Sequence, residues 1–195
     1  MWSRPTYPDA DTERDGFRFR GGHPALDLTA TLLGRLKQER RELLGTPSDL
    51  ARWLVASGLA DETPECDERS LATAVALRES IYELLVARIR RAAPPVTARK
   101  TANEIARRAS AHVQLSPRGE ARLEGDASEL LAEIARAAIL LIGGESGARV
   151  RKCEAEGCSM FFLDKSRSGA RRWCSMKACG NRFKVAEFRR RQTDR

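Results

Sequence analysis

Four of the chain's five cysteines form two C-x4-C pairs, Cys153 with Cys158 and Cys174 with Cys179. Two pairs of soft thiolates joined by a loop suit one tetrahedral Zn²⁺, which accepts four sulfur ligands. Disulfides or unrelated thiols are the alternatives, and a reducing compartment disfavours the disulfides. We therefore predict one structural zinc ion. Because four protein ligands leave no position for an activated water, we expect no catalytic metal.

The positive charge of the chain is concentrated around these cysteines. Residues 149–195 contain 14 Lys and Arg against 5 Asp and Glu, whereas residues 1–148 contain 21 against 22. The whole formal excess of +8 therefore belongs to the C-terminal segment. This asymmetry predicts a polyanionic partner for that segment and gives no such indication for the rest.

We expect the basic side chains of this segment to contact nucleic acid, mainly through phosphates. A solvated helix face is the alternative, since most charge runs are that. Asn181 could donate to and accept from an adenine edge, or hold the backbone of the zinc knuckle. The predicted contact residues are Arg171, Arg172, Asn181, Arg182, Lys184, Arg189 and Arg190.

The elements that would position these groups can be predicted from the pattern around the cysteines. Residues 160–163 and 171–173 alternate like the two arms of a hairpin with a turn at 166–169. After Cys179, helical spacing predicts a helix with Phe183 or Val185 and Phe188 facing inward. A treble-clef zinc finger has the same order of elements: a tight turn between the first two ligands, called a knuckle, then a hairpin, and then a helix that begins near the last ligand. We predict that fold here.

Residues 21–145 are predicted to form a helical domain with one small β-hairpin, so that the domain is mainly α within an α+β class. Prolines, glycines and a 3.6-residue apolar rhythm predict helices at 23–44, 46–58, 63–92, 97–109 and 126–143, with a hairpin around 116–119. Gly143 to Ala148 is the predicted boundary before the finger at 149–195. Residues 1–20 are predicted to be a flexible segment.

Other residues that could do chemistry receive structural interpretations. Asp27 and Arg78 are the candidates for binding a ligand, although a salt bridge between them is the stronger expectation. His23 is expected to cap a helix or bond locally, as is His112, and Cys66 is expected to pack. We find no recognisable catalytic set, and we predict that the chain is not an enzyme.

The distribution of apolar residues indicates a cytoplasmic protein. The first twenty residues lack the apolar block of a signal peptide, and the run from Ala137 to Ile142 is too short to span a bilayer. We therefore expect no membrane association, and a cytoplasmic, nucleoid-associated location. A homodimer formed through the helical domain would extend the limited interface of one small finger.

The C-terminal segment contains a specific set of motifs: the two cysteine pairs, Phe162 and Asp164, the run Arg172-Trp173-Cys174-Ser175-Met176, the tetrapeptide Cys179-Gly180-Asn181-Arg182, and Lys184-Val185. On these residues the segment resembles the CGNR zinc-finger family, which is named for that tetrapeptide. The family usually carries an N-terminal ABATE domain. Traces of that domain are Leu26-Asp27-Leu28, Asp49-Leu50, Trp53-Leu54, Gly58-Leu59, Leu77-Arg78-Glu79 and Asn103.

The resemblance covers nearly the whole chain and implies a bacterial, stress-induced transcription regulator. Its finger would bind double-stranded DNA and its N-terminal domain would sense a small-molecule effector. One departure stands out, because relatives read Leu-Asp-Phe-x-Asn-Thr where this chain has Ala30 in place of the asparagine. An RNA- or ribosome-associated module that stacks bases on Phe161 or Trp173 is the alternative, and an enzyme with a pocket around Asp27 and Arg78 ranks last.

Overall fold

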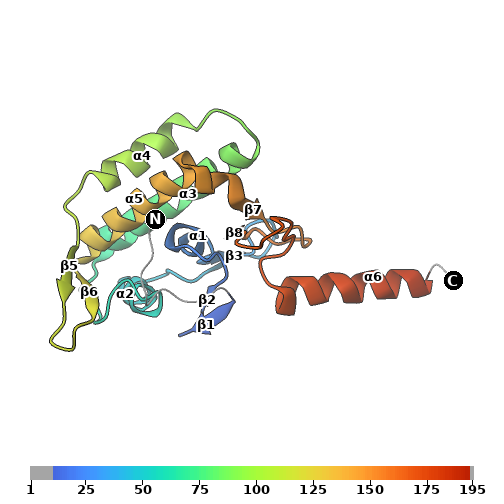
Figure 1. Cartoon of the computed structure of the whole chain (residues 1–195), viewed down its shortest axis with the longest axis horizontal. Coiled ribbons are helices and arrows are strands. Elements are labelled where there is room, and N and C mark those ends of the chain that lie inside the picture. The colour runs from blue at the N-terminus through green and yellow to red at the C-terminus, as the bar shows by residue number, and fades with distance from the viewer. Residues whose placement is uncertain (1–10, 194–195) are drawn as a thin grey trace.

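The computed structural model describes residues 11–193, which form a helical body from which a C-terminal helix projects (Figure 1). The fold combines helices with small antiparallel strand pairs, as the sequence predicted. Its α-helices are α1 (Pro24–Thr29), α2 (Pro47–Ala56), α3 (Glu68–Ile89), α4 (Val96–Ala106), α5 (Ala127–Gly143) and α6 (Asn181–Thr193).

All the strands of the described residues pair in antiparallel two-stranded sheets. The pairs are β1 (Thr12–Arg14) with β2 (Phe17–Phe19), β3 (Leu32–Leu33) with β4 (Arg41–Glu42), β5 (His112–Leu115) with β6 (Ala121–Glu124), and β7 (Val150–Lys152) with β8 (Phe161–Leu163). The predicted hairpin around 116–119 is therefore confirmed, with Val113 opposite Leu123.

Side-chain caps explain where the long helices begin. Thr46 and Asp49 form a capping box at α2, and Asp126 and Glu129 form another at α5, which confirms both predicted starts. The predicted start of α3 at Thr63-Pro64 is wrong. Asp67 accepts from the Ser70 backbone N–H at 2.7 Å, so the helix begins at Glu68.

The predicted helix over 23–44 is also wrong, because α1 ends after Thr29. The hydroxyl of Thr29 donates to the carbonyl of Leu26, and that of Thr31 donates to the carbonyl of Leu28. These bonds offer the backbone an alternative to continuing the helix. Gly34 then adopts a φ of +67°, with its Cβ position only 2.5 Å from the Glu39 carbonyl oxygen, so the chain turns into the β3–β4 hairpin.

The predicted flexible segment is ordered in its second half. Residues 12–19 form the β1–β2 hairpin, which buries Phe17 and Phe19 in the core of the body. The alternation of Phe17 and Phe19 around Arg18 is the strand signal that the sequence analysis did not use. Residues 1–10 of the predicted segment lie outside the described residues.

The body is held together by one large apolar core and a small second cluster between α3 and α4. α5 packs against both α3 and α4, and α1 lies against α3 and α5. Fully buried side chains such as Trp53, Leu77 and Ile134 fill the space between these helices. Burying a side chain of this kind contributes roughly 1.5–3 kcal/mol each. Within residues 11–193, no helix has the length and apolarity needed to cross a membrane.

The C-terminal module differs from the prediction in two ways. Its hairpin pairs β7 with β8, with Arg151 opposite Phe162, so residues 171–173 are not the second arm. Helix α6 also does not turn its apolar residues inward, since Val185 and Phe188 are 49% and 61% exposed. Phe183 alone of the three finds an aromatic neighbour, Trp173, at 5.4 Å between ring centroids.

Backbone and ring contacts fix the module against the body. The N–H of Leu163 in β8 donates to the carbonyl of Gly21 at 2.9 Å. Phe161 in the same strand is fully buried and meets the Tyr82 ring of α3 edge to face, with ring centroids 5.3 Å apart. Strand β8 therefore serves as the joint between the two parts.

Candidate metal centre

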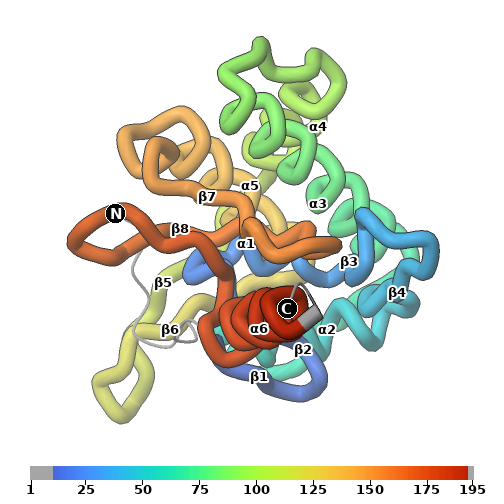
Figure 2. Tube along the Cα trace, turned by 90° about the vertical axis from the view of Figure 1, so that its right-hand side faces the viewer, coloured from blue at the N-terminus to red at the C-terminus, as the bar shows by residue number. Residues whose placement is uncertain are grey.

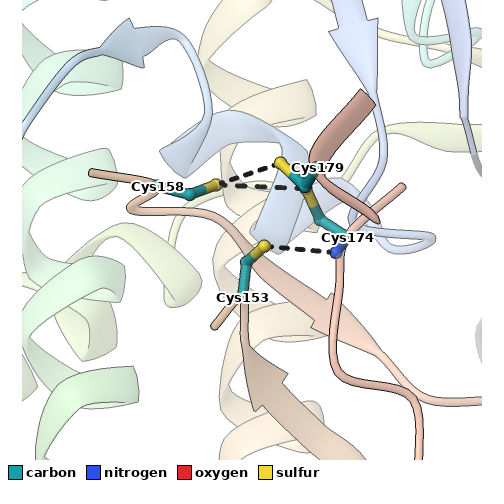
Figure 3. A group of neighbouring side chains, drawn as sticks. All are labelled: Cys153, Cys158, Cys174 and Cys179. Carbon is teal, nitrogen blue, oxygen red and sulfur yellow. Dashed lines mark hydrogen bonds between the residues drawn. The ribbon is translucent and has the colours of Figure 1, made fainter. Parts of the chain in front are cut away.

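Short structural elements bring the four predicted ligand cysteines together. Cys153 directly follows β7, and Cys158 follows Gly157, whose φ of +68° makes the tight knuckle turn. Cys174 lies in the loop before a π-helical turn over Met176–Gly180, and that turn carries Cys179. Figure 3 shows the four side chains converging from these separate segments.

The geometry of the four sulfurs fits a tetrahedral ion. All four Sγ atoms lie within 4.8 Å of one another. The Sγ atoms of Cys158, Cys174 and Cys179 are 4.0, 3.6 and 3.9 Å apart in pairs. Four sulfurs at Zn–S distances near 2.3 Å around a tetrahedral ion would be about 3.8 Å apart. The donor set and its spacing therefore suit Zn²⁺, and the cysteines form a metal-binding cluster.

The charge state of the sulfurs explains why the cluster needs a cation. Hydrogen bonds from Cys158 and Cys174 lower the pKa of Cys153 to about 2. The thiolate at Cys153 in turn raises the pKa of Cys158 to about 12 and raises that of Cys174 further. Only part of the cluster can ionise on its own, because like charges at this distance repel. A divalent cation would remove that repulsion and allow all four thiolates to form.

Two of the predicted nucleic-acid-binding arginines make hydrogen bonds within the finger, the half-buried Arg171 and the exposed Arg182 at the start of α6. Arg171 donates through Nε to the Trp173 carbonyl at 2.8 Å and through a terminal nitrogen to the Cys174 carbonyl, and its guanidinium lies 4.7 Å from the Phe162 ring centroid. Arg182 donates to Cys179 Sγ at 3.2 Å. Outer hydrogen bonds of this kind orient metal ligands, and Arg182 also offsets their negative charge.

The remaining predicted contact residues divide between the hairpin side and α6. Arg172 pairs with Glu154 at 2.5 Å, and its guanidinium lies 4.9 Å from the Trp173 ring centroid. The others are exposed on the projecting helix: Asn181, Lys184, Arg189 and Arg190. Three of the predicted contact residues thus have bonding partners within the finger, Arg171, Arg172 and Arg182, and the other four lie exposed along α6.

A link between the metal turn and the N-terminal hairpin was missed by sequence reasoning. The hydroxyl of Ser175 caps the π-helical turn by accepting from the Ala178 N–H, and it donates to Asp11 at 2.6 Å. Asp11 also accepts from Arg20 Nε at 3.0 Å. Ser175 follows a ligand cysteine, which is a usable N-cap signal, but nothing in the sequence indicates a partner 164 residues away.

Asp164, one of the motif residues, organises a loop of the finger. Its buried carboxylate accepts from the backbone N–H and hydroxyl of Ser166 and from the backbone N–H of Arg171. These bonds close the loop that returns the chain to Cys174. An aspartate that bonds to backbone groups two and seven residues ahead is a loop-forming device.

The two candidate ligand-binding residues do not form the predicted salt bridge with each other. Asp27 is buried and its Oδ1 accepts the backbone N–H groups of Arg20 and Gly21 at 2.8 and 2.7 Å. Arg78 instead pairs with Glu42 at 2.6 Å and Glu79 at 2.8 Å. Burial opposes the ionisation of Glu42, but the hydrogen bonds and charge of Arg78 outweigh it and lower the Glu42 pKa.

The histidines and the fifth cysteine have the structural roles expected of them. His23 caps α1, with Nδ1 accepting from the Ala25 N–H at 3.3 Å, and burial lowers its pKa to about 4, aided by the charge of Lys165. His112 contacts the Ser110 carbonyl locally. Cys66 packs against the core, and burial raises the pKa of its thiol.

Comparison with known families adds an independent result. The family ABATE, described as "Putative stress-induced transcription regulator", matches residues 22–145. The family described as "CGNR zinc finger" matches residues 149–192, which include all four clustered cysteines. No curated protein matches the chain.

Proposed function

The chain belongs to the ABATE family and carries a CGNR zinc finger, and on this premise we propose that it is a transcription regulator that binds double-stranded DNA through α6. The observation that carries the proposal is the helix itself. It projects from the body with its metal-binding cluster at the base (Figure 1). Its described side chains are nearly all exposed, and it holds one acid, Glu187, among its basic residues.

We propose Zn²⁺ as the ion held by Cys153, Cys158, Cys174 and Cys179. The ion would supply charge neutralisation and a rigid cross-link between the knuckle and the turn that begins α6. Arg182 would stabilise the bound state by its hydrogen bond to Cys179. The base of the helix is thereby held in one orientation relative to the body.

The dimensions and chemistry of α6 support entry into a groove of DNA. Its 13 residues span about 20 Å, and the major groove is wide enough for an α-helix. Lys184 and Arg190 make no ion pair with another described residue, which leaves them available for phosphates. Asn181 is exposed at the first turn and could make the bidentate contact with adenine that asparagine amides make.

The N-terminal domain is proposed to sense a small-molecule effector in a cytoplasmic, nucleoid-associated regulator. Asp27 and Arg78 are occupied by internal hydrogen bonds and ion pairs, so the effector proposal does not rest on them. A homodimer would double the footprint of a single finger on DNA. Light scattering of the zinc-loaded chain, with and without duplex, measures that state directly.

The alternative proposal, RNA binding by base stacking, named Phe161 and Trp173 as the side chains that would stack, and only one of them is accessible. Phe161 is fully buried in the joint with the body, so it cannot stack on a base. Trp173 is already covered by Arg172 and Phe183. The matched families are named for regulation and a zinc finger, and they do not name an enzyme class. DNA is therefore the partner that we propose.

The test is selection from genomic DNA. The zinc-loaded chain is incubated with fragments of its own genome, and fragments that stay bound at physiological salt are sequenced and compared with bulk DNA for affinity. A preference of about a thousandfold or more supports a sequence-reading regulator. A flat profile with a steep salt dependence would mean that the finger contacts phosphates only, and it would favour RNA.

A further inference from the structure

We propose that the N-terminal domain contributes a second DNA-contact surface, called here the basic loop. It comprises residues 34–41, that is, the loop between β3 and β4 together with Arg41, the first residue of β4. This inference rests on the proposed DNA-binding function and extends it from the finger to the body. The side chains that would contact phosphates are Lys37, Arg40 and Arg41. The net charge of the N-terminal region gives no indication of this surface, because acids elsewhere in the region balance these cations.

The basic loop carries three cationic side chains that form no ion pair with the described residues 11–193. Lys37, Arg40 and Arg41 are exposed, and none of them forms an ion pair with another residue in 11–193. Glu39 is the single acid between them. The neighbouring charges, by contrast, are consumed internally, since Arg35 pairs with Glu79 and Glu42 pairs with Arg78. The loop therefore presents an excess of positive charge to solvent.

The basic loop is held in a fixed position relative to the finger. The Arg35 side chain is only 9% exposed, bonds to both carboxylate oxygens of Glu79, and lies 4.3 Å from the Tyr82 ring centroid. Tyr82 in turn packs on Phe161 in β8 of the finger. A chain of contacts thus connects the loop to the strand that joins finger and body. A rigid surface binds phosphates at a lower entropic cost than a mobile one.

The basic loop lies beside the base of α6. A cavity of about 190 Å³ is lined on one side by Gly34 and Lys37 and on the other by Gly157, Cys158 and Arg182. Lys37 approaches the knuckle so closely that a Cβ on Gly157 would lie 3.0 Å from its Cε. Figure 2 shows α6 nearly end-on, with β3 and β4 to one side of it. A duplex that follows α6 therefore meets the loop with its flanking phosphates.

The test compares two triple variants for the salt dependence of duplex binding. The first is Lys37→Gln with Arg40→Gln and Arg41→Gln. The control is Arg99→Gln with Lys100→Gln and Arg118→Gln, three exposed cations on α4 and the β5–β6 hairpin, on the side of the body away from α6 (Figure 1). Affinity for one duplex is measured from low to high KCl, with zinc content and thermal unfolding as folding controls.

Each phosphate contact contributes about 0.9 to the slope of log affinity against log salt, so the loop variant should lower that slope by about 2.7. Its affinity at 0.15 M salt should fall on the order of 100-fold, while the control keeps the slope of the unchanged chain. A loop variant with an unchanged slope overturns the inference and leaves the proposed function intact. An unchanged chain that binds no duplex overturns both.

A double variant separates DNA contact from a role of Lys37 in neutralising the thiolates of the knuckle. Arg40→Gln with Arg41→Gln leaves Lys37 in place and should still lower the slope by about 1.8. If only variants that include Lys37 change binding, and they also lose zinc, then the loop supports the metal cluster and the inference is wrong.

Discussion

The helical body and the C-terminal finger differ in the kind of side chain that forms their buried clusters. In the body, the buried cluster is made of apolar side chains from the β1–β2 hairpin and helices α1 to α5, with Leu77 and Trp53 almost wholly enclosed. In the finger, the buried cluster beside the joint is Cys153, Phe162, Cys174 and Cys179. The body can therefore draw its stability from many small contributions, whereas we propose that the finger depends on one bound ion.

Because of this difference, we expect the two parts to tolerate single substitutions of their buried residues to different degrees. Loss of one leucine removes a fraction of the apolar burial of the body, and the rest of the core remains. We expect the loss of one sulfur to leave the finger with too little apolar burial to hold its fold. The following predictions test how far this contrast extends.

The largest effect is expected from Cys179→Ser. The variant should lose stoichiometric zinc and the ordered finger, at a cost on the order of 10 kcal/mol of metal-linked folding free energy, while the body stays folded. Zinc content and amide NMR spectra of the two parts measure this. Cys66→Ser is the matched control, because Cys66 lies outside the cluster. A Cys179→Ser protein with one tightly bound zinc and an ordered finger would contradict the prediction.

A core truncation in the body should have the next largest effect. Leu77→Ala should lower the free energy of unfolding of the body by about 2–5 kcal/mol, because it leaves a cavity in a fully buried site. Phe188→Ala removes an even larger apolar side chain from exposed α6 and should change stability by less than about 0.5 kcal/mol. Denaturant unfolding compares the two, and equal losses would refute the proposed contrast.

The dependence of stability on pH should reveal His23. Burial holds its folded pKa at about 4, below the ordinary value of 6.5, so the unfolded chain takes up a proton in this range and the folded chain does not. Stability should therefore fall as the pH drops from 6.5 towards 4, by up to about 3 kcal/mol.

His23→Asn keeps a side chain that can cap α1 and removes the titration. The difference in unfolding free energy between the two proteins, followed from pH 7.5 to 4, isolates the contribution of His23 from that of the carboxylates. A difference that does not change with pH would show that His23 has the same pKa in the folded and unfolded chains, and would contradict the prediction.

The smallest effect is expected at the bond between the finger and the N-terminal hairpin. Ser175→Ala removes both the cap of the π-helical turn and the bond to Asp11, and should cost about 1 kcal/mol. Asp11→Ala combined with Ser175→Ala should cost less than the sum of the two single changes, because both remove the same bond. Strict additivity would mean that the bond contributes nothing.

Sequence patterns predicted those elements whose signals are local. The helix starts at Thr46 and Asp126 and the hairpin around 116–119 each depend on residues within a few positions of one another, and all three are confirmed. The ligand set was equally local, because cysteine pairs at fixed spacing are rare outside metal sites. These features needed no knowledge of the tertiary structure.

What the sequence did not predict depended on local competition for backbone hydrogen bonds in one case and on the tertiary surroundings in the others. α1 stops because Thr29 and Thr31 bond back to the helix, and the chain is then free for the hairpin that meets the finger. Arg171 was predicted as a DNA contact from its charge alone, and the sequence did not indicate that it also donates to two backbone carbonyls of the finger. Helical spacing placed Phe188 inward, yet α6 has no surface of the body to pack against.

The bond between Asp11 and Ser175 also has a consequence for the order of assembly. The two residues are 164 positions apart, so at synthesis rates of about 5–20 residues per second the ribosome makes Asp11 roughly 8–33 s before Ser175. Throughout that interval the side chain of Asp11 has no Ser175 hydroxyl to accept a hydrogen bond from. The hydrogen bond between Asp11 and Ser175 can therefore form only after nearly the whole chain has been translated.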